Sequence, residues 1–274
     1  GVTYGYEDAH DLARVFQGKQ KGYTYGRQIN PTVEALEQKV TQMENGLATI
    51  AFGTGMAAIG TTLFALLRAG DHVIASKFLF GNTASLFESF GAHGIEITFV
   101  DATGADAVSA AVQPNTKLVF VETIANPRTQ VSDLVGIGAV CKAQGLIYVV
   151  DNTLTTPYLF QPKSVGACLV INSLTKYIGG HGNALGGSVT EMGQFDWTTF
   201  ANIHENYRVG TPSMWGLNQI KKKGLRDFGA SLAADSAHRL STGSDTLALR
   251  MPRACDNAAA LAAFFQDHDL IDAV

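Results

Sequence analysis

Short runs rich in β-branched residues alternate with longer segments of helical pattern along the chain, and this alternation constrains the fold most. Apolar strands joined by crossover helices are typical of a mostly parallel sheet with helices on both faces. In such α/β folds ligands bind at the carboxyl ends of the strands. We expect strands at 72–76, 95–100, 117–122, 146–151 and 168–172, and helices near 55–68, 81–90, 104–112 and 132–144.

Composition excludes several classes of protein. The 274 residues are 46% hydrophobic and 16% charged, which is typical of a globular chain. The net charge of −4 gives no basic field for nucleic acid, and no apolar run reaches the roughly 18 residues of a membrane span. Three distant cysteines and scattered histidines predict neither disulfides nor a metal site. Residues 1–20 lack the apolar run of a signal peptide, so we expect a cytoplasmic protein.

Two charged residues stand at neighbouring strand ends. Asp151 closes the run LIYVVD, and Lys176 follows the next expected strand in SLTKYIGGHG. An acid in this position is often only a turn or helix cap. Alternatively, Asp151 could hold a positively charged group in the crevice into which Lys176 opens. Three glycines in the four residues 179–182 would let the backbone approach a bound group closely.

A glycine-containing loop, Gly53-Thr54-Gly55-Met56, precedes the expected helix at 55–68. Free N–H groups at a helix start can bind phosphate, although such glycines also serve tight packing alone. The loop lacks the third glycine of the dinucleotide fingerprint and the GK[ST] ending of a nucleotide P-loop. A nicotinamide-dependent dehydrogenase is therefore the weaker alternative.

These parts together suit pyridoxal phosphate, which needs a lysine for its aldehyde, an acid for its ring nitrogen and donors for its phosphate. The lysine would lie buried beside the sheet, where an uncharged amine is favoured. An aromatic side chain usually covers the face of the ring. Phe80, in KFLFGNT after the strand at 72–76, could do so, or could simply belong to the core.

Several motifs in order carry a resemblance that runs almost from end to end: YTYGRQINPT, GMAAI, LFGNT, ETIANP, VVDNTLTTPY, SLTKYIGGHG and LRDFGASL. The chain resembles the Cys/Met-metabolism enzymes dependent on pyridoxal phosphate, which include cystathionine γ-synthase, homoserine-ester sulfhydrylases and methionine γ-lyase. The resemblance implies the fold of aspartate aminotransferase, known as fold type I. It also implies an amino-acid substrate and a homodimer or homotetramer with shared active sites.

The resemblance also implies a role for each matching residue. Lys176 would join the cofactor aldehyde and move protons at the substrate, and Asp151 would bind the pyridinium nitrogen. Asn126 would lie near the ring hydroxyl. The remaining predicted contacts are with the phosphate: Ser173, Thr175 and the N–H groups of Gly55 and Met56 from the same subunit, and Tyr25 and Arg27 from the neighbouring subunit.

Two departures from the family bear on the reaction. Family members usually have tyrosine where this chain has Phe80, and the γ-lyases have cysteine where it has Asn82. Phenylalanine has no proton to give a leaving group, and it resembles the O-succinylhomoserine sulfhydrylase branch. We therefore expect γ-replacement on O-acetyl- or O-succinylhomoserine by sulfide or cysteine. A C–S lyase is the alternative within the family, and an idle cofactor-binding assembly module is one of another class.

The expected organisation has three parts. Residues 1–45 form an N-terminal arm and first helix that reach the neighbouring subunit, and 46–249 form the large cofactor-binding domain. Residues 250–274 start a C-terminal domain that is largely absent, including the family's carboxylate-binding arginine. Arg250 and Arg253 lie in LALRMPRA, a segment that the family shares for other reasons, so neither is assigned that role.

Overall fold

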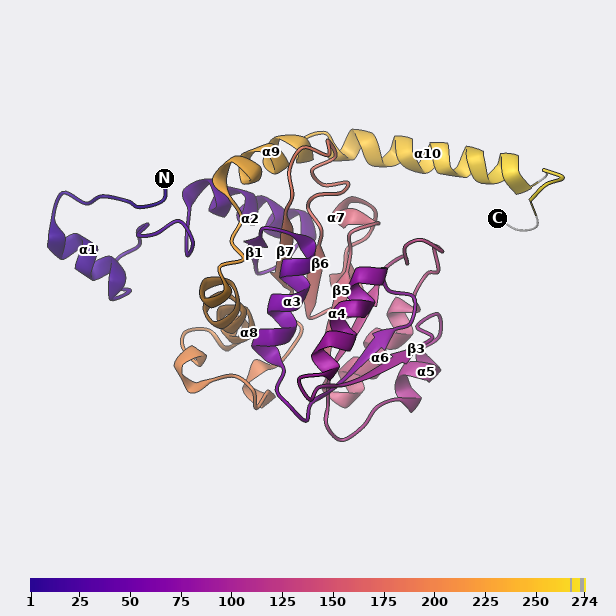
Figure 1. The fold of residues 1–274 in the computed structure, drawn as a ribbon, viewed down its shortest axis with the longest axis horizontal. Helices are drawn as coiled ribbons and strands as arrows, with labels where there is room; N and C mark the ends of the chain where they lie inside the picture. The colour runs from indigo at the N-terminus through magenta and orange to yellow at the C-terminus, as the bar shows by residue number, and fades with distance from the viewer. Residues whose placement is uncertain (267, 272–273) are drawn as a thin grey trace.

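A computed structural model describes residues 1–266, 268–271 and 274, and Figure 1 shows its ribbon. Its centre is a seven-stranded sheet in the order β1-β7-β6-β5-β4-β2-β3. The strands are β1 Ala48–Phe52, β2 His72–Ser76, β3 Glu96–Val100, β4 Thr116–Glu122, β5 Ile147–Asp151, β6 Leu169–Asn172 and β7 Gly187–Glu191. All five predicted strands are present, each within one residue of its expected bounds, and the predicted α/β fold is confirmed.

Strands β2 to β6 are parallel, whereas β7 runs antiparallel to both of its neighbours. Because β7 is reversed, its first residue, Gly187, lies beside Phe52 at the carboxyl ends of the other strands. A Cβ on Gly187 would lie 2.2 Å from the carbonyl oxygen of Thr54. A glycine is therefore required where the loop after β1 crosses the start of β7.

The helices agree with the predicted crossovers, and α2 shows how the sequence sets a helix boundary. The Asn30 side chain accepts hydrogen bonds from the N–H groups of Thr32 and Val33, with Pro31 in the first turn. The helix ends at Asn45, which has a left-handed backbone conformation. The helices are α1 Ala9–Phe16, α2 Pro31–Glu44, α3 Gly55–Leu66, α4 Gly81–Gly91, α5 Ala105–Ala110, α6 Leu134–Gln144, α7 Thr156–Leu159, α8 Trp215–Gln219, α9 Ala234–Ser244 and α10 Leu247–Gln266.

Apolar side chains pack on both faces of the sheet. The large cluster contains consecutive residues of β4 and β5, which point to alternate faces, together with residues of α3, α4, α6 and α8. Ile50 and Phe52 of β1 belong to this cluster. Ala51, which points to the other face, packs with residues of α2, α9 and the start of α10. Helices therefore cover both faces, and the carboxyl ends of the parallel strands lie between them (Figure 1).

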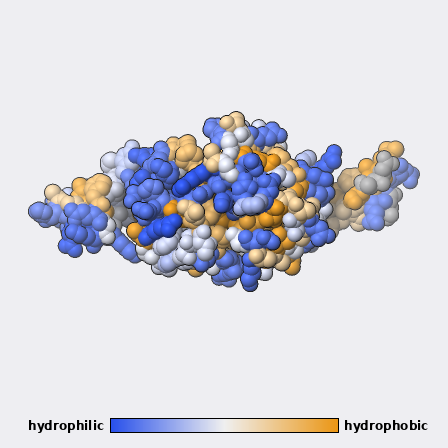
Figure 2. Space-filling view, turned by 90° about the horizontal axis from the view of Figure 1, so that it is seen from below, coloured by the Kyte–Doolittle hydropathy of each residue, from blue (hydrophilic) through white to orange (hydrophobic). Residues whose placement is uncertain are grey.

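The two terminal helices project from this body at opposite ends (Figures 1 and 2). Helix α1 buries none of its residues, and α10 buries only Leu247 and Met251 near its start. Apolar side chains on both helices are exposed, among them Phe16 and Phe264. Residues 267 and 272–273 of the expected tail lie outside the described residues. Among the described helices, none has the length and apolar character needed to cross a membrane.

Candidate active site

A cavity of about 730 Å³ opens at the carboxyl edge of the sheet, where the α/β fold predicts a ligand site. Most of the predicted site residues line this cavity: Gly55, Met56, Phe80, Asn126, Asp151, Ser173, Thr175 and Lys176. They come from five separate segments: the start of α3, the residue before α4, the loop after β4, the end of β5 and the turn after β6. The fold thus brings together residues that are up to 121 positions apart, from Gly55 to Lys176.

Lys176 lies on a turn after β6, where its own N–H donates to the Ser173 carbonyl at 3.2 Å. The Lys176 carbonyl accepts from the N–H of Gly180 at 2.7 Å, which holds the turn closed. The expectation of a buried lysine is wrong, because Lys176 is exposed at the wall of the open cavity. Its amine is therefore accessible to a small molecule that enters from solvent.

Asp151 is partly buried at the end of β5, and one of its carboxylate oxygens accepts a hydrogen bond from the N–H of Thr153 at 2.9 Å. Burial raises the pKa of Asp151, against the opposing effect of the hydrogen bonds from Thr153. Among the described residues Asp151 forms no ion pair. A protonated ring nitrogen at this place would supply the missing positive charge, so this acid fits pyridoxal phosphate.

The start of α3 provides a site for an anion. The Thr54 hydroxyl accepts from the N–H of Ala57 at 2.9 Å, while Gly55 and Met56 occupy helix positions whose N–H groups have no partner within the helix. A Cβ on Gly55 would lie 2.8 Å from the Cβ of Ser173. This close approach places the helix start beside the Ser173 side chain, and the arrangement fits a phosphate group.

The second predicted hydroxyl, that of Thr175, is already hydrogen bonded. It donates to the Gly186 carbonyl at 3.1 Å and accepts from the Gly186 N–H at 3.0 Å. Thr175 therefore joins the loop after β6 to the loop before β7, and its phosphate contact stays a prediction. Thr153 plays a related part, since its hydroxyl accepts from the N–H of Ser173 at 2.8 Å.

Phe80 borders the cavity just before α4 and is 42% exposed. Its N–H donates to a carboxyl oxygen of Glu122 at 2.8 Å. Burial and the neighbouring Asp151 raise the pKa of Glu122 to about 8. Glu122 was not among the predicted site residues, although it closes the run KLVFVE as Asp151 closes LIYVVD, and the two residues pair in register. An acid at the end of an apolar run was therefore the sequence signal that could have identified Glu122.

A second missed acid, Glu44, lies fully buried beside the cavity-lining strand ends. One of its carboxyl oxygens accepts from the side-chain amides of Asn152 at 3.1 Å and Asn172 at 2.7 Å. These asparagines directly follow Asp151 and directly precede Ser173. Burial raises the pKa of Glu44 to about 7. Glu44 thus links α2 to the two strand ends that carry predicted cofactor contacts.

Tyr25 and Arg27 do not line the cavity of their own chain. The Arg27 guanidinium donates to the Arg226 carbonyl at 2.5 Å and lies 5.4 Å from the centre of the Tyr25 ring. Their predicted contact with a neighbouring subunit's phosphate stays a prediction. Arg250, which received no role, does line the cavity.

The chain is similar over almost its whole length to enzymes with two kinds of name. An L-methionine gamma-lyase of Porphyromonas gingivalis is 35% identical over 99% of this chain and 64% of its own length. An O-acetyl-L-homoserine sulfhydrylase of Corynebacterium glutamicum is 35% identical over 100% of this chain and 66% of its own length. The chain thus spans slightly less than two thirds of the length of these relatives.

Solved structures agree in fold. A putative O-acetylhomoserine (thiol)-lyase of Campylobacter jejuni matches with a TM-score of 0.90 and 30% identity, over 98% of this chain and 70% of the other. That structure contains N'-pyridoxyl-lysine-5'-monophosphate. The model of the Cys/Met metabolism PLP-dependent enzymes matches residues 1–274, where PLP denotes pyridoxal phosphate. The fold, the cavity and the matching motifs agree, and the chain belongs to the Cys/Met metabolism PLP-dependent enzyme family.

Proposed function

We propose that the protein replaces the γ substituent of O-acetyl- or O-succinylhomoserine with sulfide or cysteine. The bond between the γ carbon and the ester oxygen breaks, and a carbon–sulfur bond forms in its place. The acyl group leaves as a carboxylate, and the product is homocysteine or cystathionine. The O-acetyl-L-homoserine sulfhydrylases among the relatives support this substrate class.

The cavity residues supply the groups that such a reaction needs. When bound, pyridoxal phosphate supplies an aldehyde and a ring that withdraws electrons from the substrate carbons. Lys176, which lines the cavity, would hold the cofactor through its amine and would be placed to move protons at the substrate carbons. Asp151 would keep the ring nitrogen charged, and the start of α3 with Ser173 would hold the phosphate.

Phe80 is the observation that favours replacement over elimination. It borders the cavity beside Glu122. The resemblance of the LFGNT motif to the family implies that most members have tyrosine at this position. A phenyl ring covers the cofactor face and offers no hydroxyl proton to a departing γ substituent. A leaving group that departs readily as a carboxylate needs less help from such a proton than a thiolate does.

The test is an assay of the purified protein, loaded with pyridoxal phosphate, on each homoserine ester with sulfide or with cysteine. Homocysteine or cystathionine should form with at least one ester. If neither product forms from either ester while the visible cofactor absorbance is present, the protein binds the cofactor without this activity. That outcome would contradict the proposed reaction.

A C–S lyase is the second candidate, because L-methionine gamma-lyases are among the relatives at 32–37% identity. A lyase would release an α-keto acid, ammonia and a thiol from methionine or cystathionine. Release of keto acid without any added thiol, at a rate above that of replacement, would establish this alternative.

We also propose that two subunits share each active site. Arg27 lies outside the cavity of its own chain, close to the projecting N-terminal segment, whose helix α1 buries nothing. An arginine fork suits the phosphate of a neighbouring site. Mixing inactive Arg27→Ala subunits with inactive Lys176→Ala subunits should restore part of the activity, because one site of a mixed dimer has both residues. No recovery in mixed dimers of confirmed composition would contradict a shared site.

A further inference from the structure

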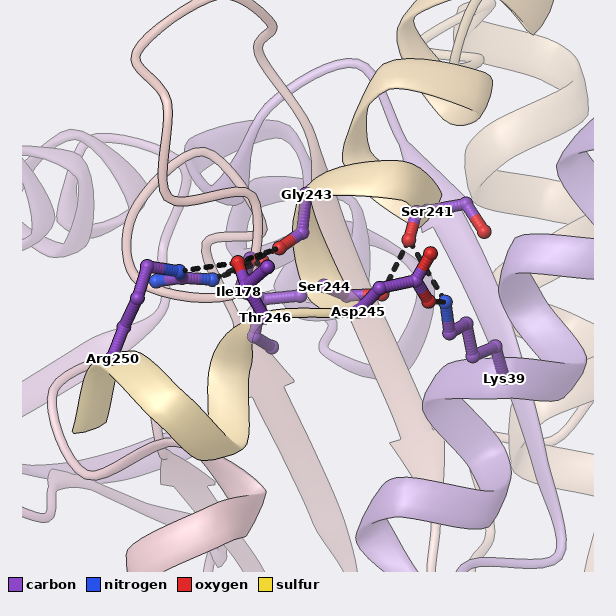
Figure 3. A network of polar contacts seen from close by, with 8 residues as sticks. All are labelled: Lys39, Ile178, Ser241, Gly243, Ser244, Asp245, Thr246 and Arg250. Atoms are coloured by element: carbon purple, nitrogen blue, oxygen red, sulfur yellow. Dashed lines mark hydrogen bonds and ion pairs between the residues drawn. The ribbon is translucent and has the colours of Figure 1, made fainter. Parts of the chain in front are cut away.

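Arg250 lies in the first turn of α10, and its guanidinium forms four hydrogen bonds. Figure 3 shows its partners Ile178, Gly243 and Thr246. Two of them reach the turn that follows Lys176: Nη1 donates to the Tyr177 carbonyl at 2.6 Å, and Nη2 to the Ile178 carbonyl at 3.2 Å. The other two stay near α9, on the Gly243 carbonyl at 3.1 Å and the Thr246 hydroxyl at 2.9 Å.

The lysine-bearing turn has carbonyl groups that its own backbone does not satisfy. Its hydrogen bonds run from the Gly179 N–H to the Leu174 carbonyl and from the Gly180 N–H to the Lys176 carbonyl. The chain then leaves the turn, so the next carbonyls have no following N–H group to accept from. Arg250 occupies these positions, and its positive charge suits the carbonyl end of a helical turn.

The space for the guanidinium depends on a glycine. Gly180 has a φ of +71°, and a Cβ added to it would lie 2.4 Å from the central guanidinium carbon of Arg250. The glycine-rich sequence after Lys176 therefore serves a second purpose besides turning the chain: it admits the Arg250 head group. Four hydrogen bonds to protein atoms also leave this guanidinium little capacity for a substrate carboxylate.

We propose that Arg250 is a positioning residue for Lys176, which acts by fixing the carbonyl end of the turn that carries the lysine. This inference rests on Lys176 as the residue that holds the cofactor in the proposed function. The same side chain, which belongs to α10, also ties the Lys176 turn to α9, since it binds the carbonyls of both Tyr177 and Gly243.

A matched control exists in the same region. Lys39 of α2 also binds α9 through a backbone carbonyl, donating to Ser241 at 2.8 Å, and pairs with Asp245 at 2.5 Å (Figure 3). Its hydrogen bonds in the described structure do not reach the lysine-bearing turn. Lys39→Met should therefore lower thermal stability without affecting the cofactor, whereas Arg250→Met should affect both.

The test uses holoenzyme in the absence of substrate and follows two properties. One is the pH midpoint of the visible cofactor absorbance, and the other is the rate of cofactor loss on dialysis. Arg250→Met should lose the cofactor about tenfold faster than the wild type. It should also shift the midpoint by about half a pH unit or more, since the environment of the amine changes. Arg250→Lys keeps the charge without the fork and should fail to restore wild-type values.

Wild-type values for Arg250→Met would overturn the inference, as would full rescue by lysine or equal effects of Lys39→Met. If Arg250→Met does not fold, Gly180→Ala tests the same contact, because its Cβ displaces the guanidinium. Gly180→Ala should then show the faster cofactor loss, and a wild-type rate of loss would contradict the proposed role of Arg250. Neither property requires turnover, so a protein that lacks the proposed reaction but binds its cofactor through Lys176 still decides the question.

Discussion

Glu122 and Glu191 are both the last residue of a strand, yet they lie at opposite ends of the sheet, measured along the strand direction. The difference arises because β7 runs antiparallel, so its end lies beside the start of β1. Glu122 is 8% exposed and Glu191 0%, and burial raises the pKa of each to about 8. By burial and by charge the two carboxyl groups are nearly equivalent.

Their surroundings separate them. Glu122 binds the N–H of Phe80 and borders the cavity beside Asp151. Glu191 is fully buried in the core. Its carboxyl oxygens accept hydrogen bonds from the Trp197 indole and the Gly193 N–H, each at 3.0 Å. A strongly raised pKa therefore does not identify a functional group by itself. The neighbouring cavity and the convergent strand ends do.

The largest expected effect is that of substituting Lys176, which lines the same cavity as Glu122. Lys176→Ala should abolish turnover and the covalent attachment of the cofactor, because no other lysine lines the cavity in the described structure. Thermal stability should change little, since Lys176 is exposed. Borohydride reduction followed by peptide mapping would check the assignment on the wild type. A label on a different lysine would contradict it.

The paired substitutions Glu122→Leu and Glu191→Leu test the comparison directly. The Glu122 change removes the acceptor for Phe80 and a cavity-lining carboxyl, so cofactor affinity should fall about tenfold. The Glu191 change leaves the buried Trp197 indole unsatisfied, which should cost about 1–3 kcal/mol of unfolding free energy while affinity is kept. Cofactor titration and denaturant unfolding measure the two effects. If both variants lose cofactor affinity equally, the functional distinction between Glu122 and Glu191 is wrong.

The same contrast shows what the sequence could predict of the fold. Strands such as β4 and β5 are buried on both faces and appear as continuous apolar runs, which makes them visible. Strands β1 and β7 were missed, because ATIAF is rich in alanine and GSVTE has a single large apolar residue. Their strand state depends on pairing with each other and on β6, which local propensity does not express.

The site residues also fall into two groups, those that could be predicted from the sequence and those that could not. Asp151, Ser173 and Lys176 follow strand ends, so strand prediction and family resemblance together locate them at the cavity. Glu44 and Arg250 were not assigned, because their importance lies in partners far along the chain. Glu44 binds Asn172, 128 positions away, and Arg250 binds the Tyr177 carbonyl, 73 positions away. Such contacts exist only after the fold has formed.

Stability should fall as pH rises from about 5 to about 8, because the folded Glu191 keeps its proton up to a pKa of about 8 whereas the unfolded chain releases it near 4.5. One such group contributes up to about 1.4 kcal/mol per pH unit within that window. Glu122 acts in the same direction. Denaturant unfolding of the protein without cofactor at several pH values measures the slope. Glu191→Gln should flatten it, whatever its absolute stability, and an unchanged slope would contradict a neutral Glu191.

The smallest effect is expected from Phe80→Tyr, which alters the cavity side while Glu122 and its hydrogen bond remain. Phe80 is 42% exposed and borders the cavity, so an added hydroxyl needs little repacking and stability should change by less than about 0.5 kcal/mol. The hydroxyl can give a proton to a departing γ substituent. The ratio of α-keto acid formation to thiol replacement, measured on one homoserine ester, should therefore rise several-fold. An unchanged ratio would mean that Phe80 covers the cofactor without setting the outcome, and that the choice between replacement and elimination is made elsewhere in the protein.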